Sequence, residues 1–252
     1  MLLISNLSAW RTLRRGPEFN GRTVGFVPTM GALHQGHVSL LERARRENDR
    51  VVLSIFVNPA QFNDTTDLAK YPRTLEADLG LAKEFADWVI VPESAALYPD
   101  EYRYRVTETV LSREFEGTCR PGHFDGVLTV VLKLLNLVAP DRAYFGEKDW
   151  QQLELVRGLA AAFLLPVDIV ACPTVRDPDG LAMSSRNRRL TEEGRLKAAV
   201  FPKILHSAPD ATTATRQLEE AGFEVDYVTD HAGARLGAIR LEGIRLIDHV
   251  RL

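Results

Sequence analysis

The sequence has little of what marks secreted, membrane-bound or nucleic-acid-binding proteins. Its two cysteines, Cys119 and Cys172, have no C-x-x-C spacing, and one pair is no disulfide framework. No apolar run approaches the roughly 18 residues that cross a bilayer, and the first ten residues are too polar for a signal peptide. The net charge is only −3, so neither a nucleic-acid nor a membrane partner is expected. A reduced, cytoplasmic setting fits this cysteine usage.

The length and composition are those of an ordinary globular protein. The chain has 252 residues, of which 45% are hydrophobic and 26% are charged. This supports one large domain or two modest ones, each with its own core. A short basic run at residues 11–15 is interpreted as a solvated helix face.

Short β-branched runs alternate with helical patterns over the first two thirds of the chain. Strands are expected at residues 23–27, 51–57, 88–91, 142–145 and 167–171, and helices at residues 36–47, 73–86, 127–138 and 151–163. The run VVLSIFV at residues 51–57 is continuously apolar, as a strand covered on both faces should be. The rhythm therefore predicts an α/β fold, a doubly wound parallel sheet with helices on both faces.

The pattern changes after Pro173. Residues 174–190 are polar and rich in Arg, a helix is expected at 191–205, and residues 207–215 resemble a linker. A further helix, a strand at 224–228 and apolar runs at 238–241 and 244–250 follow. We therefore expect a first domain at residues 1–173 and a smaller α+β domain at residues 174–252.

Neither common phosphate-binding loop occurs, since the chain has no G-x-G-x-x-G and no G-x-x-x-x-G-K-[ST]. In their place, P-T-M-G-A-L-H-Q-G-H at residues 28–37 lies between the first central strand and its helix. A helix N-terminus suits a phosphate, and His34 and His37 can share a face of the opening turn. Three interpretations remain open: a phosphate site, a structural pair, or half of a metal site that lacks further ligands nearby.

Two more segments carry cationic or hydroxyl groups. F-G-E-K-D-W-Q-Q-L at residues 145–153 brings one of only six lysines, Lys148, to the end of a strand, where an ammonium can bind a polyphosphate. A solvated helix start is the alternative. M-S-S-R-N at residues 183–187 sets two hydroxyls beside an Arg, as a triphosphate site or as an ordinary capped loop.

Two segments carry neutral polar groups. V-N-P-A-Q-F at residues 57–62 follows a strand, and Asn58 and Gln61 can hydrogen-bond hydroxyls and carboxylates. R-P-G-H-F-D-G-V at residues 120–127 precedes the most apolar helix. There Arg120 can bind a carboxylate, and His123 can cap or pack.

In this order, with Y-P-R-T at residues 71–74, these segments resemble the pantoate–β-alanine ligase family from about residue 22 to residue 190. The H-x-G-H element is shared by a wider nucleotidyltransferase superfamily, whereas N-P-x-Q-F and F-G-E-K-D-x-Q-Q are more particular to this family. The ending R-L-I-D-H is similar to the family's R-L-I-D-N. Residues 205–240 look shorter than in usual members, so the second domain is expected to be reduced.

The resemblance implies a Rossmann-like first domain and a smaller, mobile second domain that forms a lid. It implies that pantoate attacks the α-phosphorus of ATP to give pantoyl adenylate and pyrophosphate. The amine of β-alanine then attacks the acyl carbon, giving pantothenate and AMP. Mg²⁺ is implied as the companion of ATP, without assigned ligands, and a homodimer is expected.

The resemblance also implies roles for individual residues. ATP contacts are expected from Met30, Gly31, Ala32, Leu33, His34, Gln35, Gly36, His37, Gly146, Glu147, Lys148, Asp149, Val175, Met183, Ser184, Ser185 and Arg186. Pantoate contacts are expected from Asn58, Gln61 and Gln152, with Gln61 shared by β-alanine. The catalytic candidates are His34, His37, Lys148 and Arg186.

Three rival functions are weighed beside this one. Another nucleotidyltransferase of the superfamily would not need Asn58, Gln61 and Gln152 together. A nucleotide sensor with a decayed site would be expected to lose His37, Lys148 or Arg186, and all three are present. A zinc-binding structural module would need further ligands.

Overall fold

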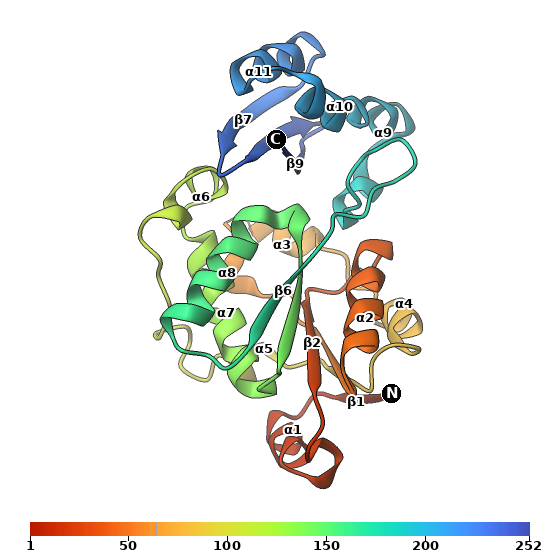
Figure 1. Cartoon of the computed structure of the whole chain (residues 1–252), viewed down its shortest axis with the longest axis vertical. Helices are drawn as coiled ribbons and strands as arrows, with labels where there is room; N and C mark the ends of the chain where they lie inside the picture. The colour runs from red at the N-terminus through yellow and green to blue at the C-terminus, as the bar shows by residue number, and fades with distance from the viewer. Residues whose placement is uncertain (64) are drawn as a thin grey trace. The chain divides into compact units, whose positions relative to one another are not determined.

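The structure is a computed structural model that describes residues 1–63 and 65–252, without the side chain of Thr65. The chain divides into two compact units (Figure 1), and each is described by itself. Unit 1 comprises Met1–Leu33, His37–Gly146 and Gln151–Cys172, and unit 2 comprises His34–Gly36, Glu147–Trp150 and Pro173–Leu252.

Unit 1 is built on a six-stranded sheet in the order β1-β4-β3-β2-β5-β6, in which every pairing is parallel. The strands are β1 (Leu2–Ile4), β2 (Val24–Thr29), β3 (Arg50–Ile55), β4 (Trp88–Ile90), β5 (Arg142–Gly146) and β6 (Asp168–Cys172). The expected strands at 23–27, 51–57, 88–91, 142–145 and 167–171 are thus confirmed to within two residues at each end. Strand β1, with three residues at the edge of the sheet, was not predicted from the sequence.

The helices of this part of the chain are α1 (Leu7–Arg14), α2 (Gln35–Glu47), α3 (Thr65–Lys70), α4 (Leu75–Ala82), α5 (Ser94–Leu97), α6 (Glu116–Cys119), α7 (His123–Val138) and α8 (Trp150–Ala162). Short 3-10 turns are η1 (Pro17–Phe19), η2 (Pro59–Gln61), η3 (Leu111–Arg113) and η4 (Glu147–Asp149). The expected helix at 73–86 is shorter than predicted, and the one at 127–138 begins four residues earlier.

The central strands are buried on both faces because their side chains alternate between two helical layers. Phe26 and Val52 pack in a core with α7 and α8, whereas Val27 and Leu53 pack in a core with α2 and α4. Figure 1 shows these helix pairs on opposite sides of the sheet. The doubly wound α/β fold expected from the apolar runs is confirmed.

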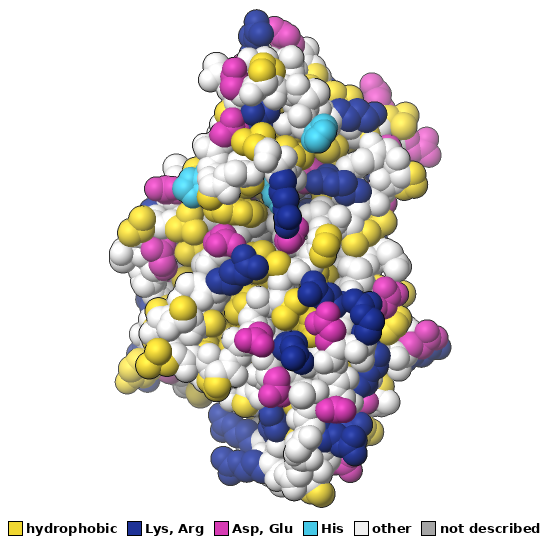
Figure 2. Space-filling model, in the orientation of Figure 1, with side chains coloured by type: hydrophobic (Ala, Val, Ile, Leu, Met, Phe, Trp, Pro, Cys, Tyr) yellow, Lys and Arg dark blue, Asp and Glu magenta, His cyan; other side chains and the backbone are white. Residues whose placement is uncertain are grey.

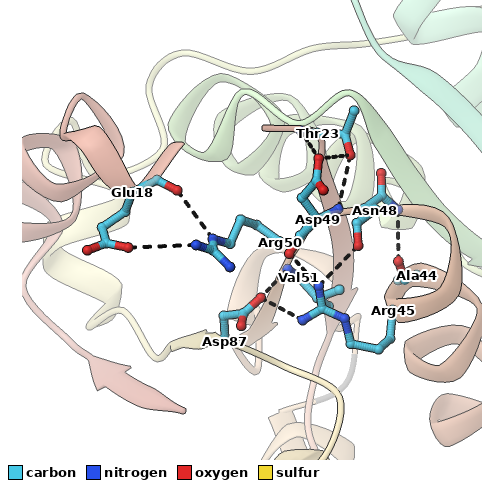
Figure 3. A network of polar contacts seen from close by, with 9 residues as sticks. All are labelled: Glu18, Thr23, Ala44, Arg45, Asn48, Asp49, Arg50, Val51 and Asp87. Carbon is cyan, nitrogen blue, oxygen red and sulfur yellow. Dashed lines mark hydrogen bonds and ion pairs between the residues drawn. The ribbon is translucent and has the colours of Figure 1, made fainter. Parts of the chain in front are cut away.

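The amino-terminal edge of this sheet is tied together by polar side chains (Figure 3). Asp87 accepts the backbone N–H of Val51 at 2.8 Å and the guanidinium of Arg45 at 2.8 Å. Asp49 accepts the backbone N–H of Thr23 at 2.9 Å. These bonds join α2 to the start of β3, at the edge opposite the carboxyl ends of the strands.

Unit 2 contains a three-stranded antiparallel sheet in the order β7-β8-β9. Its elements are η5 (Ser185–Arg189), α9 (Glu192–Ala198), α10 (Val200–Ser207), α11 (Ala211–Glu220), β7 (Glu224–His231), β8 (Ala234–Leu241) and β9 (Ile244–Arg251). Phe201, Leu205, Leu218 and Ile239 are fully buried in its core. The expected small α+β fold after Pro173 is confirmed.

Two expectations for unit 2 were wrong. The single helix at 191–205 is two helices, because Pro202 has no N–H to donate to the carbonyl of Ala198, where α9 ends. The linker-like stretch at 207–215 is largely helical. Asp210 caps α11 by accepting the N–H of Thr213 at 2.7 Å, a role typical of Asp at this position.

The basic run at 11–15 is also more than a solvated helix face. Arg14 is half-buried, and its guanidinium donates at 2.7 Å to each of the carbonyls of Val138 and Ala139. These carbonyls end α7, so Arg14 satisfies acceptors that a helix C-terminus leaves without partners.

Charged side chains of both signs share the surface. Figure 2 shows Lys and Arg side chains interspersed with Asp and Glu over the face that it draws. In residues 1–63 and 65–252, no helix is both long and apolar enough to cross a membrane.

Candidate active site

The carboxyl ends of β2 and β5 set the place of the site. These strands are neighbours, but the chain continues from β2 to β3 on one side and from β5 to β6 on the other. Open α/β sheets bind ligands where the connections diverge in this way. The two segments expected to contact ATP, residues 28–37 and 145–153, cover the ends of these two strands and the residues that follow them.

The turn after β2 is held by a buried carboxylate. Asp78 on α4 is 2% exposed and accepts the backbone N–H groups of Ala32 at 3.0 Å and Leu33 at 2.7 Å. The hydroxyl of Thr74 donates to the same carboxylate at 3.1 Å. A Cβ on Gly31 would lie 3.0 Å from the carboxylate, and φ there is +79°. Glycine is therefore required for this turn.

Asp78 was missed by the sequence analysis, although a signal was present. It lies four residues before Ala82, which is on the buried face of α4, and residues four apart share a helix face. A carboxylate at such a position is seldom buried without a dedicated partner. Here its partners are the turn that carries Ala32 and Leu33.

The first histidine of H-x-G-H shapes the start of α2. His34 lies directly before the helix, and its Nδ1 accepts the N–H of Gly36 at 3.1 Å. A neutral ring that accepts at Nδ1 carries its hydrogen on Nε2. A Cβ on Gly36 would approach the His34 ring to 2.9 Å, which explains the glycine. His37 is half-buried in the first turn of α2.

Asn58 orients Gln61 within unit 1. Asn58 is 1% exposed, and its Nδ2 donates at 3.1 Å both to Oε1 of Gln61 and to the carbonyl of Gly126. Its Oδ1 accepts the hydroxyl of Tyr98 at 2.8 Å. The protein thus satisfies the amide of Asn58, which in turn orients the side chain of Gln61. The Gln61 side chain then points its Nε2 at Sδ of Met30, 3.1 Å away.

The backbone of Gln61 is fixed by the R-P-G-H segment. Nδ1 of His123 donates to the Gln61 carbonyl at 2.8 Å, and Arg120 donates to the same oxygen at 3.3 Å. Arg120 also lies 3.1 Å from Nε2 of His123, which therefore accepts from it. A Cβ on Gly126 would lie 2.3 Å from the carbonyl of Ala60. This close approach lets α7 support the Gln61 segment.

The two adjacent glutamines of α8 have different surroundings. Gln151 is 4% exposed, and its side chain holds one loop. Its oxygen accepts the backbone N–H of Glu116 at 3.0 Å, and its nitrogen donates to the carbonyls of Leu111 at 2.7 Å and Glu114 at 2.8 Å. Gln152 is half-buried, and no described residue hydrogen-bonds to its side chain. The assignment of Gln152 to pantoate stays a prediction.

In unit 2, the η4 turn with Lys148 is packed against the antiparallel sheet. The ammonium of Lys148 is 3.8 Å from the carboxylate of Asp149, and its side chain is 18% exposed. Glu147 accepts from Arg251 on β9 at 2.8 Å. The ring of Trp150 contacts the ring of His231 on β7 edge-to-face, with centroids 5.4 Å apart.

The other expected ATP contacts of unit 2 lie on a short hairpin. The N–H of Met183 donates to the carbonyl of Val175 at 3.0 Å, next to an antiparallel bridge between Arg176 and Ala182. Ser184 caps η5 by accepting the N–H of Arg186 at 3.3 Å. Val175 and Met183 are therefore neighbours, although seven residues lie between them in sequence.

The expected site residues are shared between the units. Unit 1 contains Met30–Leu33, His37, Asn58, Gln61, Gly146 and Gln152, and unit 2 contains His34–Gly36, Glu147–Asp149, Val175 and Met183–Arg186. Across the described part of the chain, no group of three or more His, Cys, Asp or Glu side chains could hold a metal ion.

Known proteins resemble this chain over its full length. Residues 3–251 match the family model described as pantoate-beta-alanine ligase. A pantothenate synthetase of Bdellovibrio bacteriovorus is 51% identical and one of Coxiella burnetii 50%; each match covers 98% of this chain, and 97% and 96% of those proteins. A pantothenate synthetase of Legionella pneumophila is 46% identical over the whole of both chains.

Solved structures give the same result. A pantoate-beta-alanine ligase from Francisella tularensis, complexed with beta-gamma ATP and beta-alanine, has a TM-score of 0.94 and 38% identity, covering 100% of this chain and 97% of that one. The pantothenate synthetase from Thermus thermophilus has a TM-score of 0.89 and 42% identity, covering 100% and 99%. The chain therefore belongs to the pantoate-beta-alanine ligase family, enzymes that join pantoate to β-alanine.

Proposed function

We propose that the chain makes pantothenate in two steps at the residues described above. The carboxylate of pantoate attacks the α-phosphorus of ATP, forming pantoyl adenylate as pyrophosphate leaves. The amine of β-alanine then attacks the acyl carbon, forming the amide bond as AMP leaves. ATP as co-substrate is supported by the related ligase from Francisella tularensis, which was solved with beta-gamma ATP and beta-alanine.

The contact between Gln61 and Met30 carries this proposal. Gln61 presents an amide suited to a small acid, and its Nε2 lies 3.1 Å from Sδ of Met30, in the turn assigned to ATP. Adenylation requires a carboxylate oxygen to be held against the α-phosphorus, and fixed proximity of this kind supplies much of the rate in such reactions. Both residues belong to unit 1, as does Gln152, the second amide assigned to pantoate.

Cationic and N–H donors are assigned to the charge that develops on the phosphates. Lys148 and Arg186 supply fixed positive charge, and His34 and His37 supply imidazoles at the start of α2. Donors aimed at developing charge stabilise the transition state more than the ground state. Ser184 and Ser185 add hydroxyls that can donate to phosphate oxygens.

The side chains fit a Mg²⁺ ion that arrives with ATP. Proteins commonly hold Mg²⁺ with one or two carboxylates and the phosphates of the substrate, without a complete protein cage. Asp149, in the same turn as Lys148 and 47% exposed, is the carboxylate that we assign to this role. When bound, the ion would neutralise phosphate charge.

The remaining assignments concern the second domain, assembly and location. Residues 174–252 are proposed as a lid that keeps water from the adenylate, which is an easily hydrolysed acid anhydride. A homodimer and a cytoplasmic location are proposed from the family resemblance. Light scattering of the purified protein tests the dimer, since a monomeric mass would reject it.

The experiment that tests the two-step reaction follows one oxygen atom. Pantoate labelled with ¹⁸O in its carboxylate is incubated with ATP, Mg²⁺ and β-alanine, and the products are analysed by mass spectrometry. Attack on the α-phosphorus leaves one labelled oxygen on AMP after the amide forms. ADP with labelled inorganic phosphate would instead indicate attack on the γ-phosphorus and would reject the adenylate.

A further inference from the structure

Strand β9 carries a buried carboxylate, in an ion pair that the proposed reaction does not use. The carboxylate of Asp248 is 1% exposed and receives both ends of the Arg176 guanidinium, at 2.6 Å and 2.9 Å. Arg176 also donates to the carbonyls of Gly180 at 3.0 Å and His249 at 3.1 Å. This planar two-point geometry restricts Arg176 more strongly than a single hydrogen bond would.

Arg176 belongs to the hairpin at residues 175–183. It follows Val175 directly and pairs with Ala182, the residue before Met183. Fixing Arg176 on β9 therefore fixes both ends of the hairpin, Val175 and Met183, which are assigned to ATP.

The same strand also holds the η4 turn. Three residues after Asp248, Arg251 donates to Glu147 at 2.8 Å, and Glu147 precedes Lys148 in sequence. His249, the residue after Asp248, is 7% exposed, and its backbone N–H donates to the Asp248 carboxylate at 2.8 Å. All of these residues belong to unit 2. One short stretch of β9 thus contacts two of the segments of this unit that carry expected ATP contacts, the η4 turn and the hairpin at residues 175–183.

We propose that Asp248 is a positioning residue for nucleotide binding, which acts by holding Arg176 and hence the hairpin at residues 175–183. Arg251 contributes to the same positioning, because it holds the η4 turn on β9 through Glu147. This inference rests on the proposed function only in that the hairpin and the turn bind ATP. It gives a reason for the burial of the Asp248 carboxylate, because an unpaired buried charge would be costly.

A merely structural ion pair is the alternative, and the same sheet supplies a matched control. Asp226 on β7 pairs with Arg240 at 2.9 Å and with Arg245 at 2.5 Å, and its side chain is 11% exposed. Neither arginine partner lies in the hairpin or in η4. Replacing Asp226 therefore removes a comparable ion pair without releasing a segment assigned to ATP.

The test measures ATP affinity by calorimetry and KM for each substrate in wild type, Asp248→Asn, Asp248→Glu, Arg176→Lys and Asp226→Asn. Assays run well below the lowest melting temperature of the set. Misplacement by about 1 Å can cost roughly 100-fold, so Asp248→Asn is expected to weaken ATP binding by about 10- to 100-fold. KM for pantoate should change less, because Asn58, Gln61 and Gln152 lie in unit 1. Asp248→Glu and Arg176→Lys, which keep the charges, should retain part of the affinity.

The outcomes separate this inference from the proposed function. ATP binding unchanged in folded Asp248→Asn, or weakened equally in Asp226→Asn, would overturn the positioning role. Calorimetry with ATP alone needs no turnover. If wild type bound ATP but made no pantothenate, the proposed function would fail, while a selective loss of ATP affinity in Asp248→Asn would still support the positioning role.

Discussion

The carboxylate of Asp78 accepts the backbone N–H of Leu33 at 2.7 Å, across 45 positions of sequence. Through this bond, α4 holds the turn that joins β2 to α2. Gly31 and Ala32 in this turn both have positive φ, +79° and +51°, a conformation that is uncommon for a non-glycine residue such as Ala32. A buried carboxylate on another helix thus supports the turn assigned to ATP.

Replacing Asp78 by Asn should therefore weaken both folding and ATP binding. An amide has one acceptor oxygen where the carboxylate has two, so one of the N–H groups of Ala32 and Leu33 loses its partner. An unsatisfied buried donor costs about 1–3 kcal/mol. Urea unfolding should show this loss, and KM for ATP should rise. Glu76→Gln, an exposed acid on the same helix, should leave both values unchanged; equal effects in the two variants would contradict this role.

Two helical glycines give opposite expectations for substitution by alanine. At Gly126 the new Cβ would lie 2.3 Å from the carbonyl of Ala60, so α7 and the Gln61 segment must separate. Gly126→Ala should lower stability by about 1–3 kcal/mol, as overpacking does, and raise KM for pantoate. Gly158 on α8 is exposed, with nothing within 4 Å of its Cβ position, so Gly158→Ala should stabilise by about 0.5–1 kcal/mol. If Gly126→Ala changed neither the stability nor KM for pantoate, α7 and the Gln61 segment would not be as closely packed as described.

Lys148 is the most direct test of the assigned phosphate contacts. Its replacement by Ala should slow pantoate-dependent pyrophosphate release at least about 100-fold, the lower range for losing a donor aimed at developing charge. The melting temperature should change little, because the ammonium contacts only Asp149, at 3.8 Å, among the ion pairs of the described residues. Lys203→Ala, at an exposed site on α10, serves as control. Near-normal adenylate formation in Lys148→Ala would remove this residue from the mechanism.

His249 should make the stability of the protein depend on pH. Burial lowers the pKa of His249 below its ordinary value of 6.5, against the opposing charges of Asp248 and Glu147; Arg176 and Arg251 lower it further. Between the folded-state pKa and about 6.5, the unfolded chain binds a proton that the folded chain does not, so the free energy of unfolding falls as pH falls through this window.

The measurement compares melting temperatures of wild type and His249→Asn between about pH 7.5 and pH 5, where an unperturbed histidine titrates. Wild type should lose more stability on acidification than the variant, because the variant lacks the titrating group. Parallel curves would show that His249 takes up its proton as readily in the folded chain as in the unfolded chain.

Local patterns predicted the sheet well, and they put two of the candidate site segments at one edge of it. The continuous apolar runs of β2, β3 and β5 require burial on both faces, and parallel connection then brings their carboxyl ends to one edge. Segments at residues 28–37 and 145–153 could be placed at that edge because they directly adjoin or overlap the strand ends. The helix boundaries predicted near Pro202 and Asp210 were wrong. At these places a single proline or a capping side chain overrides the pattern of apolar residues.

The supporting residues could not be predicted from local patterns, because their partners are distant in sequence. Asp78 is 45 positions from Leu33, Arg176 is 72 from Asp248, and Gln151 is 40 from Leu111. Each appears as an isolated polar residue until the fold brings its partner within hydrogen-bond distance. Asn58 was assigned to pantoate, but the protein already satisfies its amide through Tyr98, Gly126 and Gln61.

The central claim, that this chain activates pantoate as an adenylate for β-alanine, is tested most directly by AMP release from ATP with each acid omitted in turn. We expect rapid AMP release only when pantoate and β-alanine are both present. With pantoate alone, pyrophosphate should form only to the amount of enzyme, as the adenylate stays bound. AMP release that continues without pantoate would contradict the account.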